Sequence, residues 1–263
     1  MNNISILAKN MNIKESQIEA VLKLLEEGAT IPFIARYRKE ATGSLDEEQI
    51  RQIEKEYTYL QNLLKRKEDV IRLITEKDLM TEDLQRQIMA CEKLTDVEDL
   101  YRPYKEKKKT KASEAIKMGL EPLAKKIMAF PTKGSLNDLA KEFPYDLEVS
   151  LTGAKYIISE WISDNAYYRK LIKNEIFFHG SMESKLKKNA KDERLVYKMY
   201  YDFSEPIRYA KHYRVLAMNR GEKEGVLSVS LSFDKDKITS LLEEKIIKNK
   251  DSFVAGEVKE ALS

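Results

Sequence analysis

The amino-acid sequence predicts a mainly α-helical protein. The 263 residues include only nine glycines and six prolines, about half the ordinary share, and so few turn-forming residues favour helices over hairpins. Capping residues recur ahead of apolar residues at helical spacing, which is a second indication of helices. Hydrophobic residues make up 42% and charged residues 35% of the chain, so we expect a folded core beneath a highly charged surface rather than disorder.

The N-terminal segment predicts two helices around a tight turn. Apolar residues at helical spacing indicate a helix over about residues 14–27, and Gly28 stands where a left-handed C-cap belongs. Thr30 is expected to cap a short second helix that holds Pro32 in its first turn. A helix-turn-helix reads DNA with the start of its second helix, but residues 31–34 are all apolar and cannot hydrogen-bond to base edges. Packing is therefore the preferred interpretation of this pair.

The longest predicted element is a helix of about 30 residues over residues 46–75. A capping box of Ser44 and Glu47 precedes it, and apolar residues then recur every three or four positions. They form a seam broken only by Lys67; its members are Ile50, Ile53, Tyr57, Leu60, Leu64, Ile71 and Ile74. We expect the seam to pack within the chain rather than to form a coiled-coil dimer, because it lasts barely four heptads.

Shorter helices follow, each with its own start and stop signals. Starts are expected at Thr81, at a second capping box of Thr95 and Glu98, at Ser113 and at Glu121. The corresponding stops are expected near Cys91, before Pro103, at Gly119 and before Pro131.

The second half of the chain predicts further helices and one strand. Asp146 and Asp164 are expected to cap two successive helices. Residues 209–219 are expected to form a third helix, which ends near Gly221. Apolar residues alternate with serines over 227–233, which is the strong strand signal of the chain. A hairpin between this strand and the segment from residue 215 is the alternative to the third helix. We expect two regions, residues 1–130 and 131–263.

Several functional classes are excluded by composition. Cys91 is the single cysteine, and His179 and His212 are the two histidines, so neither a disulfide framework nor a local metal site is expected. Glycine-rich phosphate loops and the Gly-x-Ser-x-Gly elbow are missing. We therefore expect no catalytic residues, no cofactor, no metal and no enzymatic activity. No apolar stretch is long enough to cross a membrane, and a cytoplasmic location is expected.

An abrupt charge reversal marks a candidate nucleic-acid site. Residues 76–99 hold eight acids and three bases, whereas residues 101–111 hold six bases and one acid. The basic run could neutralise phosphates without reading sequence, and its alternative is a solvated linker. Its candidate contact residues are Arg102, Lys105, Lys107, Lys108, Lys109 and Lys111.

Two weaker candidates accompany the run. Arg36, Arg38 and Lys39 form a second basic patch, although Arg36 and Tyr37 are alternatively tied to acids such as Glu98 or Asp99. Tyrosines interleave with Lys and Arg over residues 165–214 and could stack bases of a single strand. Amphipathic helices with tyrosines half in the core are the preferred interpretation of that pattern.

Longer strings of sequence resemble the Tex family of bacterial transcription accessory proteins. The resemblance is carried by residues 30–47, with the string Thr-Ile-Pro-Phe-Ile-Ala-Arg-Tyr-Arg-Lys-Glu-Ala-Thr-Gly-Ser-Leu-Asp-Glu, and by residues 94–105 with the following 119–123. Residues 158–162 and 215–227 are similar to later family landmarks, in the same order. The resemblance therefore extends over essentially the whole chain.

The resemblance implies nucleic-acid binding, with RNA favoured over DNA, in a role linked to transcription. Tex proteins continue into YqgF-like, helix-hairpin-helix and OB-fold RNA-binding domains, so this chain is expected to be an N-terminal portion without them. The portion is then a scaffold with auxiliary phosphate contacts. The alternative is a protein-interaction module that docks on the transcription machinery through residues 76–99 or the long helix.

Overall fold

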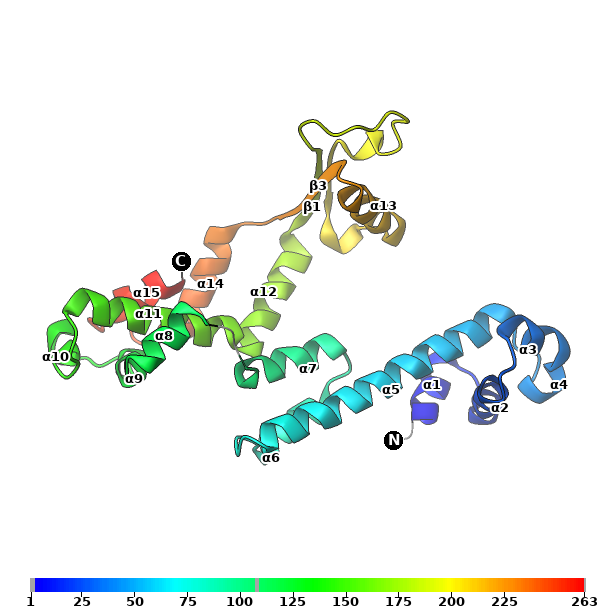
Figure 1. Ribbon diagram of the computed structural model, residues 1–263, viewed down its shortest axis with the longest axis horizontal. Helices are drawn as coiled ribbons and strands as arrows, with labels where there is room; N and C mark the ends of the chain where they lie inside the picture. Colours follow the sequence, from blue (N-terminus) through cyan, green and yellow to red (C-terminus); the bar gives the residue numbers. More distant parts are fainter. Residues whose placement is uncertain (1–2, 107–108, 263) are drawn as a thin grey trace. The chain divides into compact units, whose positions relative to one another are not determined.

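The computed structural model describes residues 3–106 and 109–262 and is mainly α-helical, as predicted (Figure 1). Contacts divide it into two compact units, Met1–Tyr104 and Lys105–Ser263. The division falls before residue 130 because α8 (Lys111–Lys117) and α9 (Glu121–Met128) pack against α11 (Leu147–Asp164) of unit 2.

Unit 1 is built along one long helix, α5 (Glu47–Thr75). Three helices pack against the N-terminal half of α5: α1 (Asn3–Met11), α2 (Glu15–Glu26) and α3 (Ile31–Tyr37). The short helix α4 (Lys39–Thr42) packs against α2 and α3. Its C-terminal half carries α6 (Glu82–Ala90), α7 (Leu94–Tyr101) and a 3-10 turn, η1 (Arg102–Tyr104). The helices predicted for residues 14–27 and 81–91 and the short helix after Thr30 are confirmed, although the Thr30 side chain makes no capping hydrogen bond.

The N-cap of the long helix lies two residues after the predicted N-cap, Ser44. Asp46, not Ser44, is the N-cap: its carboxylate accepts the Gln49 N–H at 2.8 Å, and the Gln49 side chain accepts the Asp46 N–H at 3.0 Å. Ser44 has a left-handed φ of 63° and belongs to the turn before the helix. The box of Ser44 and Glu47 was therefore wrong.

Lys67 is part of the buried seam of α5 rather than a break in it. Its stem is buried beside Val70, and its ammonium donates to the Met89 carbonyl at 2.8 Å, near the C-terminus of α6. A cation there also faces the negative end of the helix dipole. Leu63 takes the inward place that the sequence pattern assigned to Leu64, which is exposed.

Three further predicted caps are displaced by one or more residues. Lys93 precedes α7 in place of Thr95, and Glu98 pairs instead with Arg66 at 2.6 Å. Thr110, with Ser113 as its partner, opens α8. Asn165 caps α12 (Ala166–His179) in place of Asp164.

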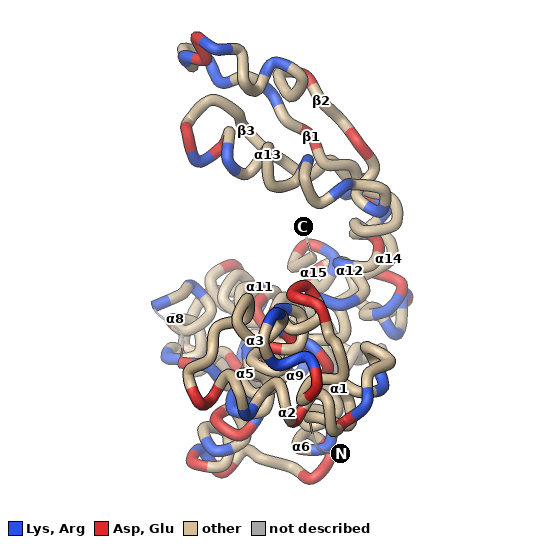
Figure 2. The backbone as a smooth tube through the Cα atoms, turned by 90° about the vertical axis from the view of Figure 1, so that its right-hand side faces the viewer, with Lys and Arg blue, Asp and Glu red and all other residues tan. Residues whose placement is uncertain are grey.

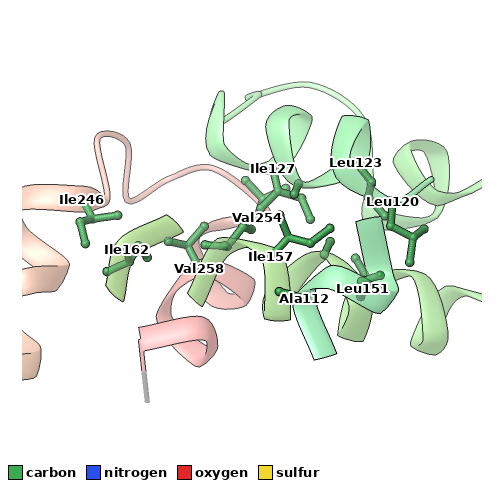
Figure 3. Packing of buried hydrophobic residues seen from close by; sticks show 14 of the residues in the cluster. Ala112, Leu120, Leu123, Ile127, Leu151, Ile157, Ile162, Ile246, Val254 and Val258 are labelled. Carbon is green, nitrogen blue, oxygen red and sulfur yellow. The ribbon is translucent and has the colours of Figure 1, made fainter. Parts of the chain in front are cut away.

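Unit 2 is organised around α11, which is buried on several sides (Figure 3). Asp146 caps this helix as predicted. The remaining helices of the unit are α10 (Leu136–Ala140), α12, α13 (His212–Lys223), α14 (Lys235–Ile246) and α15 (Ala255–Leu262). Helices α8, α9 and α15 all contact α11, so its side chains face neighbours in several directions.

A small antiparallel sheet stands between α12 and α14 and forms, with α13, what we call the sheet module (Figure 1). Its strand order is β2–β1–β3, with β1 Ser181–Leu186, β2 Asp202–Pro206 and β3 Leu227–Ser232. The predicted strand is confirmed as β3, but it pairs with β1, and the segment from residue 212 is the helix α13. Met182, Met218 and Leu227 bring sheet and helix together in one core.

The connection from β1 to β2, residues 187–201, is held by one carboxylate. Asp192 accepts the Val196 and Tyr197 N–H groups at 2.9 and 2.8 Å and the Tyr201 hydroxyl at 2.9 Å. Burial raises the pKa of this carboxyl, but the three hydrogen bonds to its charged form outweigh burial and hold the pKa below its ordinary value. The carboxylate therefore fixes the shape of the connection.

Gly153→Ala should destabilise unit 2 by about 1 kcal/mol or more, because an added Cβ overpacks the buried interface of α11. That Cβ would lie 2.3 Å from Leu120 Cδ1 and 3.3 Å from Ala115 Cβ, both buried. Gly256→Ala is the matched control, because a Cβ added there meets no heavy atom within 4 Å. Alanine should therefore raise the free energy of unfolding by about 0.5–1 kcal/mol through its helix propensity. Urea unfolding followed by the single tryptophan, Trp161 of α11, measures both; equal stabilities would refute the packing argument.

The chemical shifts of the Val196 and Tyr197 amide protons should change as the Asp192 carboxyl titrates. Because the folded pKa lies below the unfolded value of about 3.9, the stabilisation by this carboxylate is present above that value and is lost as pH falls through the folded pKa. An NMR pH titration should show both amides shifting at a common pH below 3.9. Asp192→Asn should abolish the transition, whereas a midpoint above the ordinary value would contradict the assigned hydrogen bonds.

Candidate nucleic-acid interface

The predicted basic run is divided between the two units. Arg102 is exposed in η1 of unit 1, whereas Lys105, Lys109 and Lys111 belong to unit 2. The central residues of the run, Lys107 and Lys108, lie outside the described residues. The structure therefore does not bring the six candidates together on one element.

Two cations of the run already have partners within unit 2. Lys109 pairs with Glu114 at 2.8 Å, and this hydrogen bond and charge raise the pKa of the ammonium and lower that of the carboxyl. The Lys111 ammonium lies 4.9 Å from the centre of the Tyr156 ring and 3.3 Å from its hydroxyl. Both lysines are exposed, but phosphate would have to compete with these partners.

Lys111 and Tyr156 also line a groove between α8 and α11. It has a volume of about 390 Å³ and is walled mainly by apolar surface from Ala115, Met118 and Val149. Glu114 and Glu148 contribute carboxylates to the same wall. A phosphate chain is a poor occupant of this groove, since it would meet two acids.

The second predicted patch lies in unit 1 and is exposed. Arg36 lies in the last turn of α3, and Lys39 begins α4. The Arg38 guanidinium between them lies 5.3 Å from the centre of the Phe33 ring. The pairing of Arg36 with Glu98 was wrong. Glu98 bonds Arg66 on the C-terminal half of α5, whereas α3 packs against the N-terminal half.

A set of basic residues that sequence reasoning did not single out lies at the end of β1 and on the β1–β2 connection, in blue in Figure 2. Residues 185–198 hold six bases against two acids. All six basic side chains are exposed: Lys185, Lys187, Lys188, Lys191, Arg194 and Lys198. One of the two acids, Asp192, is directed at backbone N–H groups of the connection itself, so its charge is used internally.

We call this surface, residues 185–198, the basic connection. Its excess of bases could be counted in the sequence, but only the fold shows that they share one ordered segment. The segment is anchored at both ends: Lys187 N–H donates to the Val226 carbonyl at 2.9 Å, and the Tyr197 hydroxyl donates to Glu224 at 2.8 Å. Ordered cations lose less conformational entropy when they bind phosphate than the same cations on a disordered loop.

The tyrosines between residues 165 and 214 divide into three groups. Tyr197 and Tyr200 are buried in the core of the sheet module. Tyr167, Tyr209 and Tyr213 are exposed by 59%, 59% and 62%. Tyr168 and Tyr201 are half-buried against the two cores of unit 2, as the sequence predicted. The exposed rings are available to a partner.

Two features were sought among the described residues, a cluster of metal ligands and a membrane-spanning helix. No group of three His, Cys, Asp or Glu side chains within residues 3–106 and 109–262 is placed to hold a metal ion. Among the same residues, no helix combines the length and apolar character that crossing a membrane requires.

Comparison with known proteins identifies both halves of the chain. The Tex-like protein N-terminal domain matches residues 1–75, and the Tex central region-like domain matches residues 134–258. The chain is similar to the uncharacterized protein YdcI of Bacillus subtilis, with 47% identity over 97% of the chain and 37% of that protein. It is 37% identical to the transcriptional accessory protein Tex of Neisseria gonorrhoeae, over 90% of the chain and 32% of that protein.

A more distant relative is the human S1 RNA-binding domain-containing protein 1, with 29% identity over 87% of the chain and 24% of that protein. The chain thus spans about a third or less of the length of most of these relatives. The two matching domains follow each other in the family order and together include most of the sequence. The chain belongs to the Tex-like family, of which it carries the N-terminal domain and the central region.

Proposed function

We propose that this chain is a scaffold region of a Tex-like transcription accessory protein and that it adds sequence-independent contacts to the phosphate backbone of nucleic acid. RNA is the favoured ligand, and most of its affinity comes from parts of the protein beyond this chain. The names of the gonococcal and human relatives support the links to transcription and RNA. The role is binding without catalysis, in the cytoplasm.

The observation that carries the proposal is the basic connection. Its six exposed cations stand on a segment ordered by Asp192, Tyr197 and Lys187. Cations that neutralise phosphates release condensed counterions, which gives affinity without base recognition. The run over residues 102–111 and the patch at Arg36, Arg38 and Lys39 add weaker contacts of the same kind.

The second candidate function is docking on a protein of the transcription machinery, without direct contact with nucleic acid. The acid-rich segment 76–99 favours it, because Leu79 and Met89 are exposed between its carboxylates. Exposed apolar side chains framed by charge are typical of protein contact sites. Capture of a partner that survives nuclease treatment would support this function.

Replacing Lys187, Lys188 and Lys191 together with glutamine should weaken RNA binding and flatten its salt dependence. Each lost phosphate contact on a single strand removes about 0.7 from the slope of log K against log salt, so the slope should fall by up to about 2. Fluorescence anisotropy of a labelled uridine oligomer, measured with the full chain across a salt series, gives both quantities.

The matched control replaces Lys117, Lys133 and Lys248, three exposed lysines of unit 2 that lie apart, with glutamine. The net charge changes equally, so an equal loss in both variants would show that only net charge matters. A third variant, Lys107, Lys108 and Lys109 to alanine, tests the predicted run and should have the smaller effect because Lys109 pairs with Glu114. Unchanged binding in the first variant would refute the proposed role of the basic connection.

A further inference from the structure

One corner of the sheet module exposes four aromatic rings that the proposed phosphate contacts do not use. Phe177 and Phe178 end α12 and are 47% and 53% exposed; Tyr209 lies in the 3-10 turn η3 (Ile207–Tyr209) and Tyr213 in the first turn of α13. Phe177 and Phe178 contact each other edge to face, with ring centres 5.2 Å apart. We call this surface the aromatic corner.

Gly180 brings the parts of the corner together. The Ile207 N–H donates to the Gly180 carbonyl at 3.0 Å, which fixes η3 against the end of α12. A Cβ on Gly180 would lie 2.5 Å from the Ile176 carbonyl oxygen, so only glycine permits this close turn. The rings therefore stand on a defined scaffold rather than on a loose loop.

Each exposed tyrosine of the corner is accompanied by a guanidinium. The Arg208 Cζ lies 4.5 Å from the centre of the Tyr209 ring, and the Arg214 Cζ lies 5.6 Å from that of Tyr213. Lys211, between them in sequence, is exposed. Rings and cations thus alternate over residues 208–214.

The acids next to the corner are largely buried and paired. The Glu205 side chain is 14% exposed and pairs with Arg214. Glu175 is 16% exposed; it pairs with Lys237 at 2.6 Å and lies 3.8 Å from His179. Within residues 205–214 the exposed charge is therefore positive, contributed by Arg208 and Lys211.

We propose that the aromatic corner binds single-stranded nucleic acid, with bases stacked on Tyr209 and Tyr213 and phosphates near Arg208 and Lys211. The inference rests on the proposed function and adds a stacking site to its phosphate contacts. Aromatic platforms beside cations accept any base, because each base has a π face. In a duplex those faces are covered by neighbouring bases, so the corner selects single strands. Two exposed cations with no exposed acid among residues 205–214 favour a phosphate-bearing ligand over a protein.

The test measures binding of a uridine 12-mer RNA and of an RNA duplex of equal length to the full chain by anisotropy. Tyr209→Ala combined with Tyr213→Ala should weaken the single strand about tenfold or more, because each stacked base contributes roughly 1–3 kcal/mol. Duplex affinity and the salt slope should stay unchanged, since no charge is removed. The double change to phenylalanine keeps both rings and should bind within about twofold of the unchanged protein.

Tyr167→Ala is the matched control, because this ring is as exposed as Tyr209 but lies at the other end of α12. Unchanged single-strand affinity in the double alanine variant would overturn the stacking site. If the same variant also failed to bind a protein that the unchanged chain binds, the corner would be a protein-binding site. If the Lys187, Lys188 and Lys191 variant still weakened binding, the proposed function would stand while the corner fell. If the unchanged chain bound no RNA, both would fall.

Discussion

The burial of α11 is the constraint on which unit 2 depends. Helices on several sides leave room for only small residues at points such as Gly153, where Leu120 approaches closely. Both helices that carry the sheet module are tied to this core: α12 continues directly from α11, and α14 leads into α15, which returns to it. Ser159 donates to the Ala261 carbonyl at 2.7 Å and closes that return. The module is thus held at two points.

Sequence reasoning succeeded where a signal was local and repeated. The helix after Asp146 and the alternation of β3 needed nothing beyond neighbouring residues. It failed where tertiary contacts chose among equivalent local options. Asp46 and Ser44 are both suitable N-cap residues. Ser44 has a left-handed φ in the turn before the helix, so Asp46 is the N-cap. The strands β1 and β2 lack β-branched residues, so only their pairing in the sheet, β2 with β1 and β1 with β3, and the cover of α13 make them strands.

The candidate site was harder to predict than the fold for a related reason. A count of charges along the chain weights every residue equally, whereas a surface depends on which charges are paired. The run over residues 101–111 has the sharpest excess of bases, but Glu114 lies one helical turn beyond it and pairs with Lys109. Residues 185–198 have a smaller apparent excess, but Asp192 turns toward its own backbone and leaves the surface basic.

Positive surface in this protein therefore arises from the placement of acids more than from an excess of bases. The chain holds 47 basic and 44 acidic residues, so its overall charge draws phosphate only weakly. In the sheet module, however, Asp192 organises a connection, Glu224 accepts from Tyr197, and Glu205 pairs with Arg214. Each of these acids performs a structural task. For Asp192 and Glu205 that task directs the carboxylate toward the protein, whereas Glu224 stays exposed. The contacts that fold the module thereby also create the field that a nucleic-acid backbone would meet.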